Sequence, residues 1–588
     1  MNRNKIRIGD LLVQKNEIDA DQLQEALNEQ KQTGKRLGRT LIDKGLIEED
    51  RLLHILSEQL NIPFVRLRNF QFDSDAVNLL PEATARRFRA IVLSKNNDGL
   101  LVGMSDPMDI HAYDELGRVL KVPFNQAVVR ESELFESLDF VYRNKNEISQ
   151  FAEQLEDELA RDTFDLAGLS AGSDDEDAPV VRLLQSVFED AVMSGASDIH
   201  IEPDESVLRI RQRIDGQLHE QIIKEQRISA AVVLRLKLMC GLNISEKRIP
   251  QDGRFSMRVG GKPVDVRLST LPVQYGESVV MRLLMQDEGL LNLNSTGMPM
   301  GVLERFRSLV HRPHGIVLVT GPTGSGKTTT LYGALNELNE ASRKIITAED
   351  PVEYRLPRLT QVQVNPKIDL HFSTVLRAAL RQDPDVILVG EMRDTETAEI
   401  GVRAALTGHL VLSTLHTNDA VSSALRLIDM GLEPYLVASA LQGVLAQRLI
   451  RRVCDHCAEP YEPTFAESIW LEANEADPRD SYRAGVGCYQ CSNTGYKGRV
   501  GVFELLDFDE AMLTHLRNND QGGLVEAVRG SGEFHSLSDN ALELAAAGTT
   551  SIEEVLRISA HNAEESLGEA VARDAMSPDN MAPAPVVS

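Results

Sequence analysis

The chain has 588 residues, 42% of them hydrophobic, and a formal net charge of −27 at pH 7. Its length exceeds what a single hydrophobic core supports, so we expect roughly three to five domains, and the acidic balance argues against a protein that coats nucleic acid, since such proteins generally carry a basic footprint. The sequence has no apolar run of about 18 residues that would span a bilayer, and its start, MNRNKIRIGD, lacks the apolar segment of a signal peptide, which predicts a cytoplasmic protein.

The first predicted element is a tandem repeat. RIGDLLVQKNEIDADQLQEALNEQ, at residues 7–30, is followed by RLGRTLIDKGLIEEDRLLHILSEQ at residues 36–59, and the two share ten identities at an offset of 29. Repeats of this length usually form stacked helical units, but such stacks generally need at least three copies, and only two are found in this sequence. In the second copy Leu52, Leu56 and Gln59 lie at helical spacing, on one face of one helix. We therefore predict a helical pair at the start of the chain.

A small α/β domain is expected next, over residues 69–142, which contain the stretch AIVLSKNNDGLLVGMSDPMD. It is followed by an acidic segment in which eleven carboxylates lie between Glu147 and Asp177, with Arg161 as the one basic residue. Because like charges repel each other and Gly and Ser add conformational freedom, we predict a flexible linker at residues 143–177.

A second α/β domain is predicted over residues 178–288. Strand-like patterns alternate there with SAAVVLRLKLMCGL, which is a predicted helix. The single cysteine of this helix, Cys240, is expected to be a small buried apolar residue.

The clearest chemistry begins at residue 315, where GIVLVTGPTGSGKTTTLYGAL reads as an apolar strand, a glycine-rich loop and the start of a helix. That order is the context of a P-loop. Backbone N–H groups of such a loop turn toward phosphate oxygens, Lys327 supplies positive charge at the β- and γ-phosphates, and the Thr328 hydroxyl is a ligand for Mg²⁺. The predicted nucleotide-binding residues are Gly321, Pro322, Thr323, Gly324, Ser325, Gly326, Lys327, Thr328 and Thr329.

Carboxylates follow two apolar stretches beyond the P-loop. VILVGE delivers Glu391 at the carboxyl end of a strand, where open α/β sheets place their ligands, and this residue is predicted to hold Mg²⁺ or its water. IITAEDPVEY offers Glu349, Asp350 and Glu353. Either Glu349 or Glu391 is able to polarise the attacking water, and the sequence leaves the choice open.

Two histidines bracket the next strand. In ALTGHLVLSTLHTNDA, residues 405–420, His409 and His416 flank an apolar run beside the nucleotide-binding segment. This placement suits sensing of the γ-phosphate, and His416 is the catalytic candidate. A lone histidine more often has a structural role, which is the alternative here.

Four cysteines form two C-x-x-C pairs, CDHC and CYQC. Paired knuckles of this kind suit tetrahedral coordination of Zn²⁺ by thiolates, and disulfides are the weaker alternative in a reducing cytoplasm. His456 lies inside the first pair and is not taken as a ligand. The predicted metal ligands are Cys454, Cys457, Cys488 and Cys491.

Four stretches together, GPTGSGKTTT, ITAEDPVEY, ILVGEMRD and TGHLVLSTLHTNDA, resemble the Walker A, Asp box, Walker B and His box of the type II secretion/type IV pilus assembly ATPases. The preceding domain, with SDIHIEPDESVLRIRQRIDGQL, resembles the second N-terminal domain of that family. The resemblance implies a RecA-like core that hydrolyses ATP with Mg²⁺, an inserted zinc module, and arginines that reach the nucleotide, some from a neighbouring subunit. Arg213 and Arg254 are the favoured catalytic arginines. The full set of candidates is Arg211, Arg213, Arg248, Arg254, Arg267 and Arg282.

The N-terminal repeat resembles the tandem module of the pilus-assembly ATPases of the mannose-sensitive haemagglutinin type, which binds the bacterial second messenger cyclic di-GMP. That motif runs as Arg-Leu-Gly, paired aliphatics, a Gly, and then Leu, Leu and Gln at helical spacing. The second copy matches throughout, and the first departs at Ile8 and at Asn16, where Asn tolerates the left-handed backbone that Gly supplies. The implied contacts are Arg7, Ile8, Gly9, Leu12, Leu23, Leu27, Gln30, Arg36, Leu37, Gly38, Leu41, Leu52, Leu56 and Gln59.

The symmetry of this messenger gives the pair a purpose, because two identical guanylate halves suit two similar half-sites. The alternative is that the leucines are only helix core and that the repeat is a docking module.

The predicted fold class is multidomain α/β, with a helical tandem-repeat N-terminal domain, small α/β domains, and a RecA-like P-loop ATPase core with an inserted zinc module. The predicted segments are a cyclic di-GMP-binding repeat at 1–68, a companion domain at 69–142, a linker at 143–177, an arginine-bearing domain at 178–288, the ATPase core at 289–562 with its zinc module near 450–500, and a disordered tail rich in Ala, Pro and acidic residues at 563–588.

These features predict a homo-hexameric ATPase that drives type IV pilus assembly through an inner-membrane platform protein, under control of cyclic di-GMP and without nucleic acid. Three alternatives stay open. A type II secretion ATPase shares the same motifs, a nucleic-acid motor belongs to a different class, and a second-messenger receptor would use its ATPase as a switch.

Overall fold

The computed structural model describes residues 8–33, 37–67, 70, 72, 74–77, 79–96, 99–142, 148, 151–156, 178–285, 292–491, 493–532 and 534–560. Arg7, Arg36, most of the predicted linker and the whole predicted tail lie outside these residues. The chain divides into two compact units: the first comprises residues 1–284, 454–457 and 486–495, and the second comprises residues 285–453, 458–485 and 496–588. None of the described helices is both long enough and apolar enough to cross a bilayer.

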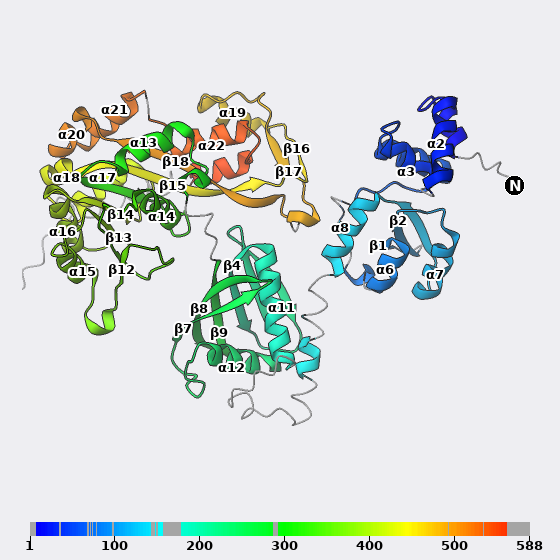
Figure 1. The fold of residues 1–588 in the computed structure, drawn as a ribbon, viewed down its shortest axis with the longest axis horizontal. Helices are drawn as coiled ribbons and strands as arrows, with labels where there is room; N and C mark the ends of the chain where they lie inside the picture. The colour runs from blue at the N-terminus through cyan, green and yellow to red at the C-terminus, as the bar shows by residue number, and fades with distance from the viewer. Residues whose placement is uncertain are drawn as a thin grey trace, which may run out of the picture. The chain divides into compact units, whose positions relative to one another are not determined.

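The two copies of the repeat fold in the same way, as a short helix followed by a longer one (Figure 1). In each copy a residue with positive φ ends the short helix: Asn16 at 57° and Gly45 at 68°. The departure at Asn16 therefore preserves the backbone that glycine gives the second copy. The helices are α1 (Ile8–Gln14), α2 (Ala20–Thr33), α3 (Leu37–Asp43) and α4 (Glu49–Leu60).

The two copies pack against each other with reciprocal contacts. Lys15 of the first copy pairs with Glu58 of the second, and the equivalent lysine, Lys44, pairs with the equivalent glutamate, Glu29, at 3.0 Å. Such reciprocity is the mark of a two-fold interface, which closes on itself. The pair therefore needs no third repeat. Its shared core consists of Leu12, Ile18, Ala26, Leu41, Ile47, Leu52 and Ile55.

A three-stranded sheet with strand order β1-β2-β3 forms the companion domain. The chain that leaves the repeat extends this sheet, because Val65 N–H donates to the Val128 carbonyl at 2.9 Å and Val128 N–H donates to the Pro63 carbonyl at 2.8 Å. Beside it, Arg130 forms an ion pair with Asp50 of α4. The elements are α5 (Ser74–Val77), α6 (Glu82–Phe88), β1 (Ala90–Asn96), β2 (Gly99–Met104), α7 (Ile110–Leu120), β3 (Phe124–Val128) and α8 (Glu131–Tyr142).

The next domain of the first unit is a six-stranded sheet with the order β6-β5-β4-β9-β8-β7. Its helix α12 contains a buried lysine, Lys237, which pairs with buried Glu277 and donates to the Glu246 carbonyl at 2.7 Å. Cys240 is half-buried rather than buried, and burial raises the pKa of its thiol to about 11. The elements are α11 (Pro179–Ser194), β4 (Ala196–Pro203), β5 (Leu208–Ile214), β6 (Gln217–Ile223), α12 (Ser229–Met239), β7 (Gln251–Val259), β8 (Lys262–Val273) and β9 (Gly276–Met285).

The second unit is built on a seven-stranded sheet with the order β12-β11-β13-β14-β10-β15-β18. The first six strands are parallel, and β18 pairs antiparallel with β15. Helices cover both faces, which explains why the central strands read as continuous apolar runs. The strands are β10 (Gly315–Thr320), β11 (Ile345–Glu349), β12 (Thr360–Gln363), β13 (Val386–Val389), β14 (Leu410–Leu415), β15 (Leu441–Val453) and β18 (Tyr496–Asp507).

Between β15 and β18 the chain forms a small inserted hairpin, β16 (Ala458–Pro460) with β17 (Arg483–Gly485), and one helix, α19 (Phe465–Ala473) (Figure 1). The helices of the second unit's core are α13 (Met300–Val310), α14 (Lys327–Leu338), α15 (Phe372–Ala379), α16 (Thr395–Leu406), α17 (Ala420–Asp429), α18 (Pro434–Ala440), α20 (Glu510–Arg517), α21 (Gln521–Gly530) and α22 (Leu537–Ala546).

Candidate active site

The P-loop leaves the carboxyl end of β10, whose six residues are all buried, and α14 begins at Lys327. Gly321 and Gly326 have φ values of 141° and 91°, which a residue with a side chain rarely adopts. A Cβ at Gly321 would also lie 2.4 Å from the Gln447 carbonyl oxygen. The loop thus presents its backbone N–H groups and the N-terminus of a helix, an arrangement that binds phosphate.

Lys327 folds back onto this loop. Its ammonium donates to the Gly321 carbonyl at 2.6 Å and to the Pro322 carbonyl at 3.0 Å. Burial and the nearby charge of Arg448 lower the pKa of Lys327 to about 8, although Glu391 opposes them. The site therefore holds a half-buried amine that is suited to pair with a polyphosphate.

Glu391 comes two residues after β13 and lies in the same charged cluster. Its carboxylate is 2.7 Å from Arg393 Nη2 and 3.4 Å from His416 Nε2, at the end of β14. Burial lowers the pKa of His416, and Lys327 lowers it further, while Glu391 opposes the shift. The sheet thus brings together Lys327, Glu391 and His416, which the sequence placed in three separate motifs.

Glu349, at the end of the neighbouring strand β11, is in a different environment. It is buried, and its carboxylate accepts hydrogen bonds from Tyr332, Thr347 and, at 3.3 Å, Gln361. The sequence motifs did not indicate that Tyr332 belongs to this network. The one feature of the sequence that could have indicated it is its position on α14, five residues after Lys327.

Of the other candidates in these loops, Asp350 is exposed and Glu353 is half-buried. His409 lies just before β14, at the end of the strand opposite to His416, and contacts the Ala404 carbonyl through Nδ1 at 2.9 Å. The prediction that both histidines sense phosphate is therefore wrong for His409, whose contact with the Ala404 carbonyl is structural.

The six candidate arginines all lie in the first unit. Arg213 donates to the Gly216 carbonyl at 2.9 Å and is 3.8 Å from Asp198, which also accepts from Arg282 at 3.2 Å. Arg254 is exposed on β7, directly opposite Arg267 in the β7–β8 ladder. Arg211 pairs with Glu202 at 2.5 Å and Arg248 pairs with Glu246 at 2.7 Å.

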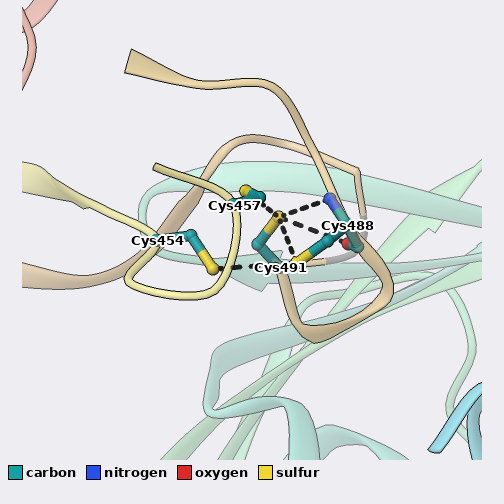
Figure 2. A group of neighbouring side chains, drawn as sticks. All are labelled: Cys454, Cys457, Cys488 and Cys491. Carbon is teal, nitrogen blue, oxygen red and sulfur yellow. Dashed lines mark hydrogen bonds between the residues drawn. The ribbon is translucent and has the colours of Figure 1, made fainter. Parts of the chain in front are cut away.

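The four predicted metal ligands meet in one buried cluster (Figure 2). Their sulfur atoms all lie within 4.8 Å of one another, with Cys454 and Cys488 at 3.8 Å, Cys457 and Cys491 at 3.8 Å, and Cys488 and Cys491 at 3.7 Å. A tetrahedral ion with Zn–S bonds of about 2.3 Å places its sulfurs about 3.8 Å apart. The cluster therefore fits zinc, and the cysteines are free rather than disulfide-bonded.

The electrostatics of the cluster also fit a cation. Burial raises the pKa of Cys488 to about 11. Burial acts in the same direction on Cys491, but the N–H groups of Cys488 and Gly495 point to its sulfur at 3.2 and 3.3 Å, and its pKa is lowered. Four buried thiols in contact need a positive ion to become thiolates together. His456 is exposed beside the cluster.

The predicted messenger contacts lie on α1 to α4, apart from Arg7 and Arg36. Leu12 and Leu41 are fully buried in the core of the pair, as the helix-core alternative expects. A Cβ at Gly9 would lie 2.7 Å from Leu23, and one at the equivalent Gly38 would lie 2.9 Å from Leu52. These glycines therefore let the helices approach each other in both copies, and ligand contact remains a prediction.

Known proteins resemble this chain over most of its length. The "Type II/IV secretion system protein" family model matches residues 173–557, and the "MshEN domain" model matches residues 60–148. The type II secretion system ATPase E of Vibrio cholerae serotype O1 is 44% identical over 498 residues, 83% of this chain and 97% of that protein. The type IV pilus assembly ATPase PilB of Myxococcus xanthus is 40% identical over 559 residues, 94% and 98% of the two chains. A solved structure of MshE with cdg is 43% identical and covers 23% of this chain and 99% of that chain, with a TM-score of 0.23.

Binding of a nucleoside triphosphate should take up a proton at alkaline pH. The pKa of Lys327 is about 8 in the free protein, so above that pH its amine is mostly neutral, and a bound polyphosphate will favour the charged form. We expect uptake approaching one proton at about pH 9 and little at about pH 6.5, measured by calorimetry in buffers of different ionisation enthalpy. Lys327→Arg, which stays charged, should bind without uptake; equal uptake at both pH values would contradict the assignment.

Zinc should be present at about one ion per chain, because four thiolates complete a tetrahedral shell. Metal analysis of the purified protein measures the content, and cobalt substitution should give thiolate-to-metal absorption bands. Cys488→Ala should lose the metal, whereas Cys240→Ala, which changes the cysteine outside the cluster, should keep it. A well-folded protein without metal would contradict the prediction.

Proposed function

The chain belongs to the type II/IV secretion system protein family and is an ATPase of that family, and from this premise we propose that it hydrolyses ATP to drive assembly of a type IV pilus. The observation that carries the pilus assignment is the extent of the likeness. The pilus assembly ATPase of Myxococcus xanthus matches 94% of this chain, whereas the secretion ATPase of Vibrio cholerae matches 83%. The match to the pilus motor thus takes in more of the chain.

The charged cluster suggests how the chemistry is divided. Glu391 lies near enough to Lys327 to raise its pKa, so this carboxylate, with the Thr328 hydroxyl, would hold Mg²⁺ at the phosphates. The ion would neutralise charge on the transferred phosphoryl group. Glu349 is the last residue of the adjacent strand, β11. Gly390, the residue before Glu391, donates its N–H at 2.7 Å to the carbonyl of Ala348, the residue before Glu349. We assign Glu349 to the attacking water, with His416 beside the γ-phosphate.

A ring of six copies would complete each site. Arg254 is exposed, and no ion-pair partner for it lies among the described residues, so its guanidinium is available to a neighbouring copy. Arg213 is held by Gly216 and Asp198 and would act as a second cation. Arginines supplied across an interface stabilise the charge of phosphoryl transfer. We propose that the ring acts on an inner-membrane platform protein from its cytoplasmic side.

Cyclic di-GMP is the proposed regulatory ligand of the helical pair. Support comes from the two-fold reciprocity of the pair, because equivalent lysines and glutamates exchange partners between the copies. A ligand with two identical halves would present the same groups to both copies. The two arginines of the motif, Arg7 and Arg36, would each bind a phosphate or a guanine edge.

Type II secretion is the second candidate function. It is favoured by the 44% identity to the secretion ATPase of Vibrio cholerae, which exceeds the 40% identity to the pilus motor. The chemistry of the site is the same in both cases, so the two functions differ in the machinery that the motor serves.

Calorimetric titration of cyclic di-GMP into the full-length protein tests the ligand. We expect one ligand per chain, and Arg7→Ala or Arg36→Ala should each weaken binding by about tenfold or more, because each removes one charge-assisted contact. Arg51→Ala, which removes an arginine that pairs with Glu17 on the same module, should bind like the wild type. Absence of binding by the wild type would leave the repeat as a docking module.

A Glu391→Gln variant tests the motor and the machinery it serves. Loss of this carboxylate should lower the kcat for ATP by about a hundredfold or more, and cells carrying it should lose surface pili while proteins secreted by the type II route still leave the cell. Electron microscopy and secretion assays measure the two outcomes. Glu399→Gln, a surface change on α16, serves as the control. Normal pili with a block in secretion would favour the second candidate instead.

A further inference from the structure

We propose that Arg448 is a positioning residue for ATP hydrolysis, which holds the loop at residues 416–419 in register with the P-loop, and that Gln447 beside it fixes the P-loop itself. Neither residue belongs to a nucleotide motif of the sequence. The proposal rests on the ATPase activity of the family and adds two residues to the machinery that performs it.

The sheet places β15 at the right level for this role. Thr320, the last residue of β10, lies opposite Leu415 of β14 on one side and opposite Ala446 of β15 on the other. β10 and β14 end there and continue as loops, whereas β15 continues as a strand to Val453, paired with β18. Residues 447 and 448 therefore lie beside the two loops. Unlike the loops, they belong to a strand that is paired with its neighbour β18.

Gln447 points to the face of the sheet that packs against α14. Its side chain is buried, and its amide nitrogen donates to the Ser325 carbonyl at 2.8 Å while its amide oxygen accepts from the Thr330 hydroxyl at 2.8 Å. Its backbone carbonyl lies against Gly321, where a Cβ would come within 2.4 Å. One residue of β15 thus contacts the P-loop at its start, at its end and at the helix that follows.

Arg448 points to the opposite face, because successive side chains alternate along a strand. Its guanidinium donates through Nη2 to both the carbonyl and the side-chain oxygen of Asn418, at 2.7 and 3.1 Å. Its Nη1 lies 3.1 Å from the position of a Cβ at Gly321. A single side chain therefore spans from the start of the P-loop to the loop that carries His416.

The C-terminal end of that loop, at Ala420, is also fixed by a side chain of the sheet. Ala420 N–H donates at 2.7 Å to Glu504, which lies on β18 directly opposite Ala446. The second oxygen of Glu504 accepts from Leu537 N–H at 3.1 Å. Thr417 is held as well, because its N–H donates to the Thr320 hydroxyl at 3.2 Å. The loop that carries His416 is therefore fixed at three points, and the Arg448 contact with Asn418 is the one that a side chain of β15 supplies.

This geometry predicts an effect on turnover rather than on nucleotide binding. Arg448→Met in the full-length protein should lower the kcat for ATP by about tenfold to a hundredfold, the size expected for a misplaced catalytic group. The KM for ATP should change by less than about threefold, and the thermal unfolding midpoint should stay near that of the wild type. Arg452→Met is the matched control, since it removes the same charge from the same strand, roughly 13 Å farther along.

A double-mutant cycle with Asn418→Ala isolates the contact. If Arg448 acts by holding Asn418, the second substitution should add little to the loss in kcat caused by the first, because residues that share one interaction are not additive. Arg452→Met combined with Asn418→Ala should be additive. A raised KM at unchanged kcat would make Arg448 a nucleotide contact instead, and additive losses or a fall in kcat that follows loss of folded protein would also overturn the proposal.

Discussion

The catalytic unit depends on the alignment of three strand ends. In a parallel sheet every strand delivers its following residues to the same edge. Here β10 and β14 end together, with Thr320 opposite Leu415, and β13 ends beside them, with Val389 opposite Ser413 of β14. The P-loop, Glu391 and His416 are neighbours for this reason alone, although up to about a hundred residues of sequence separate them. Thr414 reinforces the alignment by donating to the Gly390 carbonyl at 2.7 Å, which fixes the residue before Glu391.

Polar groups gathered at one edge of the sheet need hydrogen-bond or ion-pair partners, and the protein itself supplies them. Lys327 turns back to two carbonyls of its own loop, Glu391 pairs with Arg393 and His416, and Glu349 is enclosed by Tyr332, Thr347 and Gln361. Under the roles proposed above, each of these contacts would be exchanged for a contact with nucleotide or water.

Much of this architecture could be predicted from the sequence where the signal is local. The P-loop is a contiguous pattern, the helix at SAAVVLRLKLMCGL forms as α12, and Asn16 adopts the positive φ inferred from its equivalence to Gly45. Contacts between distant residues could not be predicted in this way. Arg448 meets Asn418 and Glu504 meets Ala420 only after β15 and β18 have paired, and His409 was misjudged because its motif does not say which end of β14 faces the nucleotide.

The helical pair shows how a local departure can leave a global symmetry intact. Substitution of Asn for Gly at position 16 would matter if it changed the turn, but Asn16 and Gly45 have φ values within the same left-handed region, so both short helices end in the same way. In each copy the longer helix then packs on the short helix at an equivalent glycine, with Leu23 against Gly9 and Leu52 against Gly38. Because the turns and the packing match, Lys15 and Lys44 reach equivalent glutamates across the pair. Two copies related in this way satisfy each other's surfaces, and a symmetric ligand is the kind of molecule that would find equal half-sites in both.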